Sequence, residues 1–335
     1  MTTFELSEKD KLAYSVGALL YSPAIQEGLA EKIAAGAYEA LTSLAFCLED
    51  SIRDDALRLA EEKLKTTLNS IKGRSIENSP LLFVRIRTPE HLKYIHAFLK
   101  DEEEILTGYI LPKFDLTNAE EYKTLIETIN AGREKPLYFM PILESLQIAD
   151  LATRRETLLK LKKILDGVER YILNVRVGGN DLCNLFGIRR SVRHTIYDIG
   201  VVRDILSDIL NVFSRDYVVS GPVWEYFGKS TSGAWAIGLQ AECEKDRANG
   251  FIGKTAIHPA QLPVIAHSMA VSRRDFEDAK AVLGWDSDSL GVAKGSGGER
   301  MNEVRCHLNW AKKILILAKL YGIRDEETKG RIVPY

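Results

Sequence analysis

The sequence has few of the residues that build metal knuckles and disulfide frameworks. Its 335 residues include only four cysteines, which are Cys47, Cys183, Cys243 and Cys306. They lie far apart in the chain and form no CxxC pair, so the sequence offers neither a zinc knuckle nor a disulfide framework. We expect all four to be buried as small hydrophobic side chains.

Long apolar runs and an excess of charge of one sign are also missing. The first residues, MTTFELSEKDKLAYS, are polar with interleaved charges, and no later run is long enough to cross a bilayer. The formal net charge is -2 and the basic residues are scattered, which excludes an electrostatic footprint for nucleic acid. We therefore predict a cytoplasmic protein with no nucleic-acid partner and no membrane partner.

The sequence instead repeats one pattern, in which a short apolar, β-branched run is followed by polar residues and then by an amphipathic helical stretch. With 45% hydrophobic residues the chain can bury one large barrel or two ordinary domains. Eight such runs decide between them and predict an α/β fold, a (β/α)8 TIM barrel. The runs are 16–22, 41–50, 80–87, 108–114, 136–145, 171–181, 216–221 and 250–259.

We place this barrel in residues 1–270 and a C-terminal helical extension in residues 271–335. The glycine- and serine-rich stretch 284–300 is expected to be a mobile loop. A strongly apolar helix, VRCHLNWAKKILILAKLYGI, follows it and is expected to pack on its own barrel or on a neighbouring subunit.

Polar residues gather at the carboxyl ends of the predicted strands, where a parallel barrel forms its active site. Glu144 and Asp181 end two neighbouring strands, and a shared divalent cation explains why both would be held ionised there. Oxygen ligands without a nearby histidine favour Mg²⁺ or Mn²⁺ over zinc. Taken singly, each carboxylate could equally be a solvated loop residue or a helix N-cap. Gly178 and Gly179 would let the backbone approach a ligand closely.

The motifs CLED, FVRI, LPKF, PILES, GGNDL and GFIGKTAIHPAQL stand in an ordered series from about residue 16 to residue 261. This series resembles the citrate lyase beta subunit-like proteins of the HpcH/HpaI aldolase superfamily. It looks like a divergent branch of carbon-carbon bond lyases associated with tellurium-resistance and stress genes.

The resemblance implies roles for individual residues. Glu144 and Asp181 would hold Mg²⁺, while Glu49 and Asp50 of CLED would support metal-bound waters or order the ligands. Arg85 would clamp a substrate carboxylate or enolate oxygen, and an ion pair with Glu49 or Asp50 is compatible with that role.

Further positions follow from the same series of motifs. Lys113, Pro23, Gly178 and Gly179 are assigned to the substrate side of the site. His258 is expected to anchor the last barrel loop rather than to carry a proton. Glu303 of GERMNEV is either a proton-transfer group supplied by a neighbouring subunit or an ordinary glutamate at a helix N-terminus.

The chain also departs from the family pattern. Ala24 replaces a glycine after Pro23, and no arginine precedes the first strand, so binding of coenzyme A is in doubt. Arg87 and Asp115 likewise replace an asparagine and a glutamate.

We therefore predict a magnesium-dependent carbon-carbon lyase for a small oxo or hydroxy acid or its thioester. The alternatives are a malate synthase-like condensing enzyme and a non-catalytic metabolite-binding subunit of a stress-response assembly. A homo-oligomer, trimer or hexamer, is expected from the resemblance.

Overall fold

The computed structural model describes residues 6–74, 76, 79–285, 291–325 and 331–333. Two compact units divide the chain. Residues 16–265 form the first, and the described residues of 1–15 and 266–335 form the second. None of the described helices has the length and apolar character needed to span a membrane.

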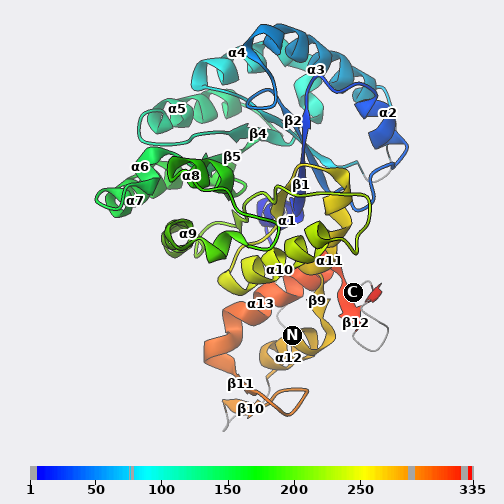
Figure 1. Ribbon diagram of the computed structural model, residues 1–335, viewed down its shortest axis with the longest axis vertical. Coiled ribbons are helices and arrows are strands. Elements are labelled where there is room, and N and C mark those ends of the chain that lie inside the picture. The colour runs from blue at the N-terminus through cyan, green and yellow to red at the C-terminus, as the bar shows by residue number, and fades with distance from the viewer. Residues whose placement is uncertain (1–5, 75, 77–78, 286–290, 326–330, 334–335) are drawn as a thin grey trace. The chain divides into compact units, whose positions relative to one another are not determined.

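The first unit is a closed parallel barrel whose helices lie outside the strands (Figure 1). Its eight strands follow the order β7-β6-β5-β4-β3-β2-β1-β8, and a parallel bridge between Gly221 and Lys254 closes the ring. The strands are β1 (Ala18–Pro23), β2 (Ser43–Cys47), β3 (Leu81–Arg85), β4 (Gly108–Leu111), β5 (Tyr138–Leu143), β6 (Val175–Val177), β7 (Val219–Ser220) and β8 (Lys254–Ala256). The predicted barrel is confirmed: seven of the eight predicted runs contain a strand, and the first, 16–22, overlaps β1, which ends one residue later at Pro23.

The helices between the strands each bury one stripe of side chains. In α3 (Leu57–Lys72), for example, the buried residues include Ala60, Leu64, Leu68 and Ile71, spaced three or four positions apart. The other helices of this part of the chain are α2 (Leu29–Ala34), α4 (Pro89–Leu99), α5 (Ala119–Asn130), α6 (Leu146–Ala149), α7 (Arg154–Asp166), α8 (Gly179–Leu185), α9 (Gly200–Phe213), α10 (Ala234–Asn249) and α11 (Leu262–Met269).

The second unit contains α1 (Glu8–Ser15) and two helices packed together, α12 (Arg273–Leu283) and α13 (Val304–Tyr321). The C-terminal helical extension is thus confirmed. Short strands β9 (Val271–Ser272), β12 (Ile323–Asp325) and β13 (Arg331–Val333) form a small sheet.

Part of the stretch predicted as a mobile loop has regular structure. Strand β10 (Val292–Lys294) pairs antiparallel with β11 (Met301–Glu303). The fully buried Asp278 of α12 accepts a hydrogen bond from the backbone N–H of Ser296 at 2.6 Å and another from Arg300 at 2.5 Å. Residues 286–290 of the predicted loop lie outside the described residues.

One cysteine prediction is wrong. Cys47, Cys183 and Cys243 are buried, whereas Cys306 is exposed. Cys306 lies in the first turn of α13, and the buried residues of that helix are Ala311, Ile314, Ile316, Leu317 and Ala318, further along the chain. The apolar character of the whole helix hid the fact that its first turn is solvated.

Candidate active site

A cavity of about 390 Å³ lies where the barrel strands end, and we call it the mouth cavity. The residues that line it come from every barrel strand except β4, or from the segments that follow those strands. They are Tyr21, Asp50, Arg85, Ile142, Glu144, Arg176, Val177, Gly178, Gly179, Asn180, Asp181, Asn184, Val223, Thr255 and Ile257.

Glu144 and Asp181 both line this cavity, as the sequence pattern predicts. Glu144 follows β5 and is only 4% exposed, while Asp181 lies in the first turn of α8. Burial and, to a lesser extent, the charge of Asp181 raise the pKa of Glu144 to about 8, although Arg85 opposes this rise. A buried carboxylate whose ionised form is disfavoured, with a second carboxylate beside it, is suited to bind a cation.

Gly178 makes room for the Glu144 carboxylate. A β-carbon at position 178 would lie 1.9 Å from Glu144 Oε2 and 2.4 Å from Glu144 Cβ. The backbone N–H of Lys113 donates a hydrogen bond to Glu144 Oε1 at 2.9 Å and fixes the other carboxylate oxygen. The φ angle of 48° at Lys113 places this residue in the left-handed region, an uncommon conformation for a lysine.

The donor set fits Mg²⁺ or Mn²⁺ better than zinc. Among the described residues no three histidine, cysteine, aspartate or glutamate side chains gather as a ready ligand cluster. Magnesium is commonly bound by one or two carboxylates, with waters and substrate oxygens completing its octahedron. Glu144 and Asp181 can therefore hold such an ion, whereas a structural zinc site would need more protein ligands.

Arg85 ends β3 and lies close to both Glu144 and the pair Glu49 and Asp50. Its Nη2 lies 2.8 Å from Glu49, 3.4 Å from Asp50 and 3.8 Å from Glu144, and its guanidinium lies over the ring of Tyr21. The buried Nε has no hydrogen-bond partner. Burial lowers the pKa of Arg85, but Tyr21 and Glu49 outweigh it and raise the value. This arginine is thus a permanent cation with one N–H left free.

Glu49 and Asp50 differ sharply in environment although they are neighbours in the sequence. Glu49 is 6% exposed, and burial followed by its hydrogen bond with Asp50 raises the pKa of Glu49. Asp50 is exposed, and its hydrogen bond with Glu49 and the charges of Arg85 and Lys113 lower its pKa against the opposing effect of burial. Lys113 Nζ reaches Glu49 at 2.8 Å and Asp50 at 3.3 Å. Of the two carboxylates, Glu49 therefore favours its protonated form and Asp50 its ionised form.

Arg87, which departs from the family pattern, supports the loop that carries this pair. Its Nε donates to the backbone carbonyl of Leu48 at 2.7 Å, its Nη2 donates to that of Ile52 at 2.5 Å, and it also pairs with Asp54. The loop after β2 is held by these contacts on both sides of the two carboxylates.

The remaining predicted residues lie in different places. Gly178 and Gly179 line the mouth cavity, and Gly179 would clash with Pro222 if it carried a β-carbon. Pro23 ends β1 but is not among the residues that line the cavity. Glu303 belongs to the second unit, where it precedes α13 and its backbone N–H donates to His307 Nδ1 at 2.9 Å. Its supply to a neighbouring subunit's site stays a prediction.

His258 and Lys254 have structural contacts. The His258 ring accepts a hydrogen bond from the backbone N–H of Ala260 and stacks on Phe227 with ring centroids 4.4 Å apart. These are the contacts of an anchoring residue. Lys254 is fully buried and pairs with Glu242 at 2.8 Å and Asp246 at 2.7 Å on α10, outside the mouth cavity.

Among the polar residues of the cavity that sequence reasoning missed, Tyr21, Arg176 and Thr255 belong to the strands themselves. Tyr21 interacts with both Arg85 and Arg176, and burial raises its pKa while the two arginines lower it. Arg176 donates a hydrogen bond to Thr255 Oγ1 at 2.7 Å. These residues lie within strands and not after them, so attention to strand ends alone does not find them.

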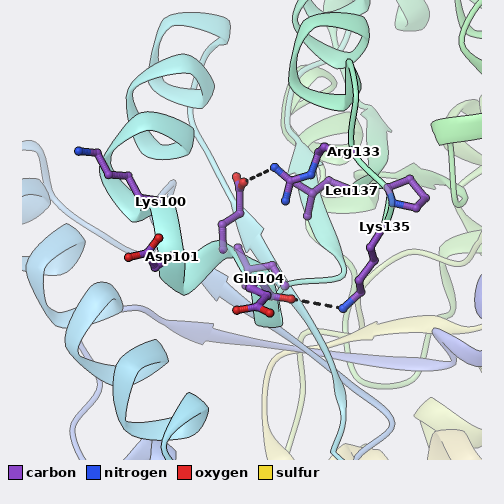
Figure 2. Close-up of a pocket in the computed structure, with 9 residues that line it drawn as sticks. Lys100, Asp101, Glu104, Arg133, Lys135 and Leu137 are labelled. Atoms are coloured by element: carbon purple, nitrogen blue, oxygen red, sulfur yellow. Dashed lines mark hydrogen bonds and ion pairs between the residues drawn. The ribbon is translucent and has the colours of Figure 1, made fainter.

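A second cavity of about 220 Å³ lies at the amino ends of β4 and β5, and Figure 2 shows its charged lining. Two of its cationic side chains already have partners within the protein. Arg133 contacts the buried Glu103 at 2.9 Å, and Lys135 donates to the backbone carbonyl of Glu104 at 3.3 Å. In barrel enzymes this end serves stability, and we assign no catalytic role to the cavity.

The fold and the mouth cavity define a TIM-barrel protein with carboxylates gathered at the carboxyl end of its strands. The sequence matches the family of carbon-carbon bond lyases of the TIM-barrel fold over residues 10–323. The chain therefore belongs to this family. A comparison with curated proteins found no match.

Solved structures with the same fold include CitE from Mycobacterium tuberculosis in complex with magnesium, acetoacetate and coenzyme A. It is 21% identical, with a TM-score of 0.58 over 90% of this chain and 97% of that one. The citrate lyase beta subunit from M. tuberculosis with oxaloacetate and magnesium is 21% identical, with a TM-score of 0.50 over 77% and 98%. RipC from Yersinia pestis is 16% identical, with a TM-score of 0.52 over 76% and 95%.

Proposed function

We propose that this protein is a magnesium-dependent carbon-carbon lyase that cleaves a small oxo or hydroxy acid, or its thioester, by an aldol or Claisen route. One observation carries the proposal: Glu144 and Asp181 line a cavity at the barrel mouth, together with the buried cation Arg85. The family of the chain and the magnesium-bound structures of its relatives support it.

Glu144 and Asp181 would hold the cation, which supplies positive charge beside the oxygen on which negative charge develops during cleavage. The free Nε–H of Arg85 would bind a substrate carboxylate or the enolate oxygen. Its other contacts, to Glu49 and Asp50, hold the guanidinium in place. The charge that appears in the transition state thus meets a group that is already oriented.

Asp50 would take the proton of the substrate hydroxyl at a carboxylate oxygen. It lines the cavity, and Arg85 and Lys113 keep it in its charged form. As the proton leaves, the carbon-carbon bond breaks and its electron pair passes into the enolate. Glu49 shares a hydrogen bond with Asp50 and favours the protonated form, so it can hold this proton until the enolate carbon takes it up. Glu303 from a neighbouring subunit is the other candidate base.

The test is calorimetric titration of Mg²⁺ and Mn²⁺ with pyruvate, oxaloacetate and glyoxylate added in turn. Glu144→Gln should lose more metal affinity than the roughly 10- to 100-fold that loss of an outer-shell partner costs. Asp181→Asn should abolish turnover with little loss of folding.

Glu103→Gln is the matched control, because it removes a buried carboxylate at the opposite end of the barrel. It should lower stability and leave metal affinity unchanged. Wild-type protein that binds no metal with any of the acids would contradict the proposal, and so would an active Asp181→Asn variant. Incubation with glyoxylate and acetyl-coenzyme A, followed by assay of free thiol, tests the condensing direction.

A homotrimer or homohexamer is part of the proposal, since the in-trans role of Glu303 needs a neighbouring subunit. Light scattering of the purified protein tests this part. A monodisperse monomer would exclude that role for Glu303 and leave the proton transfer to Asp50.

A further inference from the structure

Arg176 is the one buried arginine of the described chain that faces no carboxylate. The described chain buries four arginines, and three of them pair with acidic side chains. Arg85 pairs with Glu49 at 2.8 Å, Arg154 with Asp208 at 2.9 Å and Arg190 with Glu242 at 2.5 Å. Arg176 is 1% exposed, and among the described residues no acidic oxygen lies within 4 Å of it.

The hydrogen bonds of Arg176 are also incomplete. Its Nη2 donates to Thr255 Oγ1 at 2.7 Å and the guanidinium also interacts with the Tyr21 side chain, while Nε and Nη1 are buried and have no hydrogen-bond partner by distance and angle. A buried charge without a counter-ion is costly, and free N–H groups add to that cost. Burial lowers the pKa of Arg176, and the contact with Tyr21 only partly opposes this effect. Arg176 lines the mouth cavity, so an anionic ligand that enters the cavity can supply a counter-ion and accept hydrogen bonds from the free N–H groups.

Arg176 lies one layer deeper in the barrel than Glu144. It is in register with Ile142 on β5, while Glu144 and Gly178 lie two residues further along their chains. Two residues correspond to about 6.6 Å along a strand, and residues two apart face the same side. A ligand with one end at Glu144 and Asp181 therefore needs only a short carbon chain to bring a second anionic group to Arg176.

We propose that Arg176, oriented by Thr255 and flanked by Tyr21, forms a second anion subsite, and that the substrate is a small acid with two free anionic groups. The position of the first group rests on the proposed function. Arg85 is assigned to the first group, because its Nη2 lies 2.8 Å from Glu49, 3.4 Å from Asp50 and 3.8 Å from Glu144.

Ordered water is the competing explanation for the free N–H groups. The buried side chains of Asn174 and Ser220 also have polar atoms without partners, and the strand pattern places both on the same side as Arg176. Water bridges among these groups would satisfy Arg176 without any ligand. This explanation makes Arg176 a structural residue and predicts no preference for a second anionic group.

The experiment compares acids that differ only in a carboxylate or a methyl group. The pairs are tartronate with lactate, malate with 2-hydroxybutyrate, and 2-hydroxyglutarate with 2-hydroxyvalerate, each titrated by calorimetry with and without Mg²⁺. Wild type should prefer the dianion of at least one pair by about 10- to 150-fold, the range for hydrogen bonds to a charged group. Arg176→Met should reduce this preference to nearly one, and Thr255→Val should weaken it.

Stability without ligand gives an independent readout. Arg176→Met should unfold at the same temperature as wild type or at a higher one, because it removes a buried charge that lacks a partner. A clear fall in the unfolding temperature, together with an unchanged preference among the acids, would overturn the proposal in favour of the water-bridged structure.

The two proposals fail separately. Metal binding by wild type with no preference in any pair would overturn the anion subsite and leave the proposed function standing. A preference that depends on Arg176 and persists with EDTA, in protein that binds no metal, would establish the subsite and overturn the magnesium site. Arg176→Lys, which keeps the charge but loses the planar fork, should retain part of the preference.

Discussion

Replacing Gly178 by alanine tests whether the geometry of Glu144 determines metal binding. The φ angle of Gly178 is -95°, so the backbone itself tolerates alanine. The added β-carbon, however, would lie 1.9 Å from Glu144 Oε2 and 2.4 Å from Glu144 Cβ. Real β-carbons essentially never approach closer than 3.0 Å, so Oε2 must move by about 1 Å.

The size of the effect follows from this displacement. Overpacking of a buried position costs about 1 to 3 kcal/mol of unfolding free energy. A ligand must be held within about 0.5 Å of its productive position, so a shift of about 1 Å disrupts the site. We expect Mn²⁺ affinity to fall about 10- to 100-fold, comparable to the loss of an outer-shell partner.

Calorimetry with Mn²⁺ and urea unfolding measure the two effects on the same preparations. Gly200→Ala is the control, because a β-carbon there meets nothing closer than Arg203 Nη2 at 4.0 Å. That variant should keep wild-type metal affinity. If Gly178→Ala binds Mn²⁺ as tightly as wild type while remaining folded, Glu144 is not a metal ligand in the geometry described above.

Two further predictions concern buried charges outside the mouth cavity. Lys254→Met leaves the buried Asp246 without its cation and Glu242 with Arg190 alone, and should cost about 3 to 5 kcal/mol of unfolding free energy; an unchanged urea midpoint would show that the network contributes little. In the second unit, burial raises the pKa of Asp278, but hydrogen bonds from Ser296 and Arg300 outweigh it and hold the value at about 2. Because this folded-state pKa is below the unfolded value, Asp278 contributes about 2 kcal/mol above pH 4, which is lost as the pH falls toward 2. Asp278→Asn should flatten this acid dependence in urea titrations, and an unaltered pH profile would contradict the assignment.

The barrel could be predicted because its signals are local and repeated. Each apolar run ends in polar residues, and parallel strands bring those ends to one mouth. The ends of the strands could not be predicted in the same way, since the apolar pattern does not show where the hydrogen bonding between strands stops. The run 171–181 contains only the short strand β6, and Asp181 lies instead in the first turn of α8. The side chain still reaches the cavity because the helix begins directly after the strand.

Side-chain contacts between segments that are distant in the sequence could not be predicted from it. The partners of Asp278 lie in the stretch predicted to be mobile, and nothing in its glycine-rich composition indicates that a buried carboxylate fixes it. Arg87 likewise looks like a simple loss of the family asparagine. Only the structure shows that it holds the loop of Glu49 and Asp50 through backbone carbonyls.

Arg176 was visible in the sequence by a signal of a different kind. In the run YILNVRVGGND, asparagine, arginine and glycine alternate with Leu173, Val175 and Val177. Strands of a parallel barrel are normally apolar on both faces, so alternation within one of them marks a polar interior at that strand. Strand β6 is where the cavity extends below the carboxylates, with Arg176 at that depth. The alternation therefore predicts the depth of the polar lining, and it contains Arg176, the residue on which the proposed anion subsite rests.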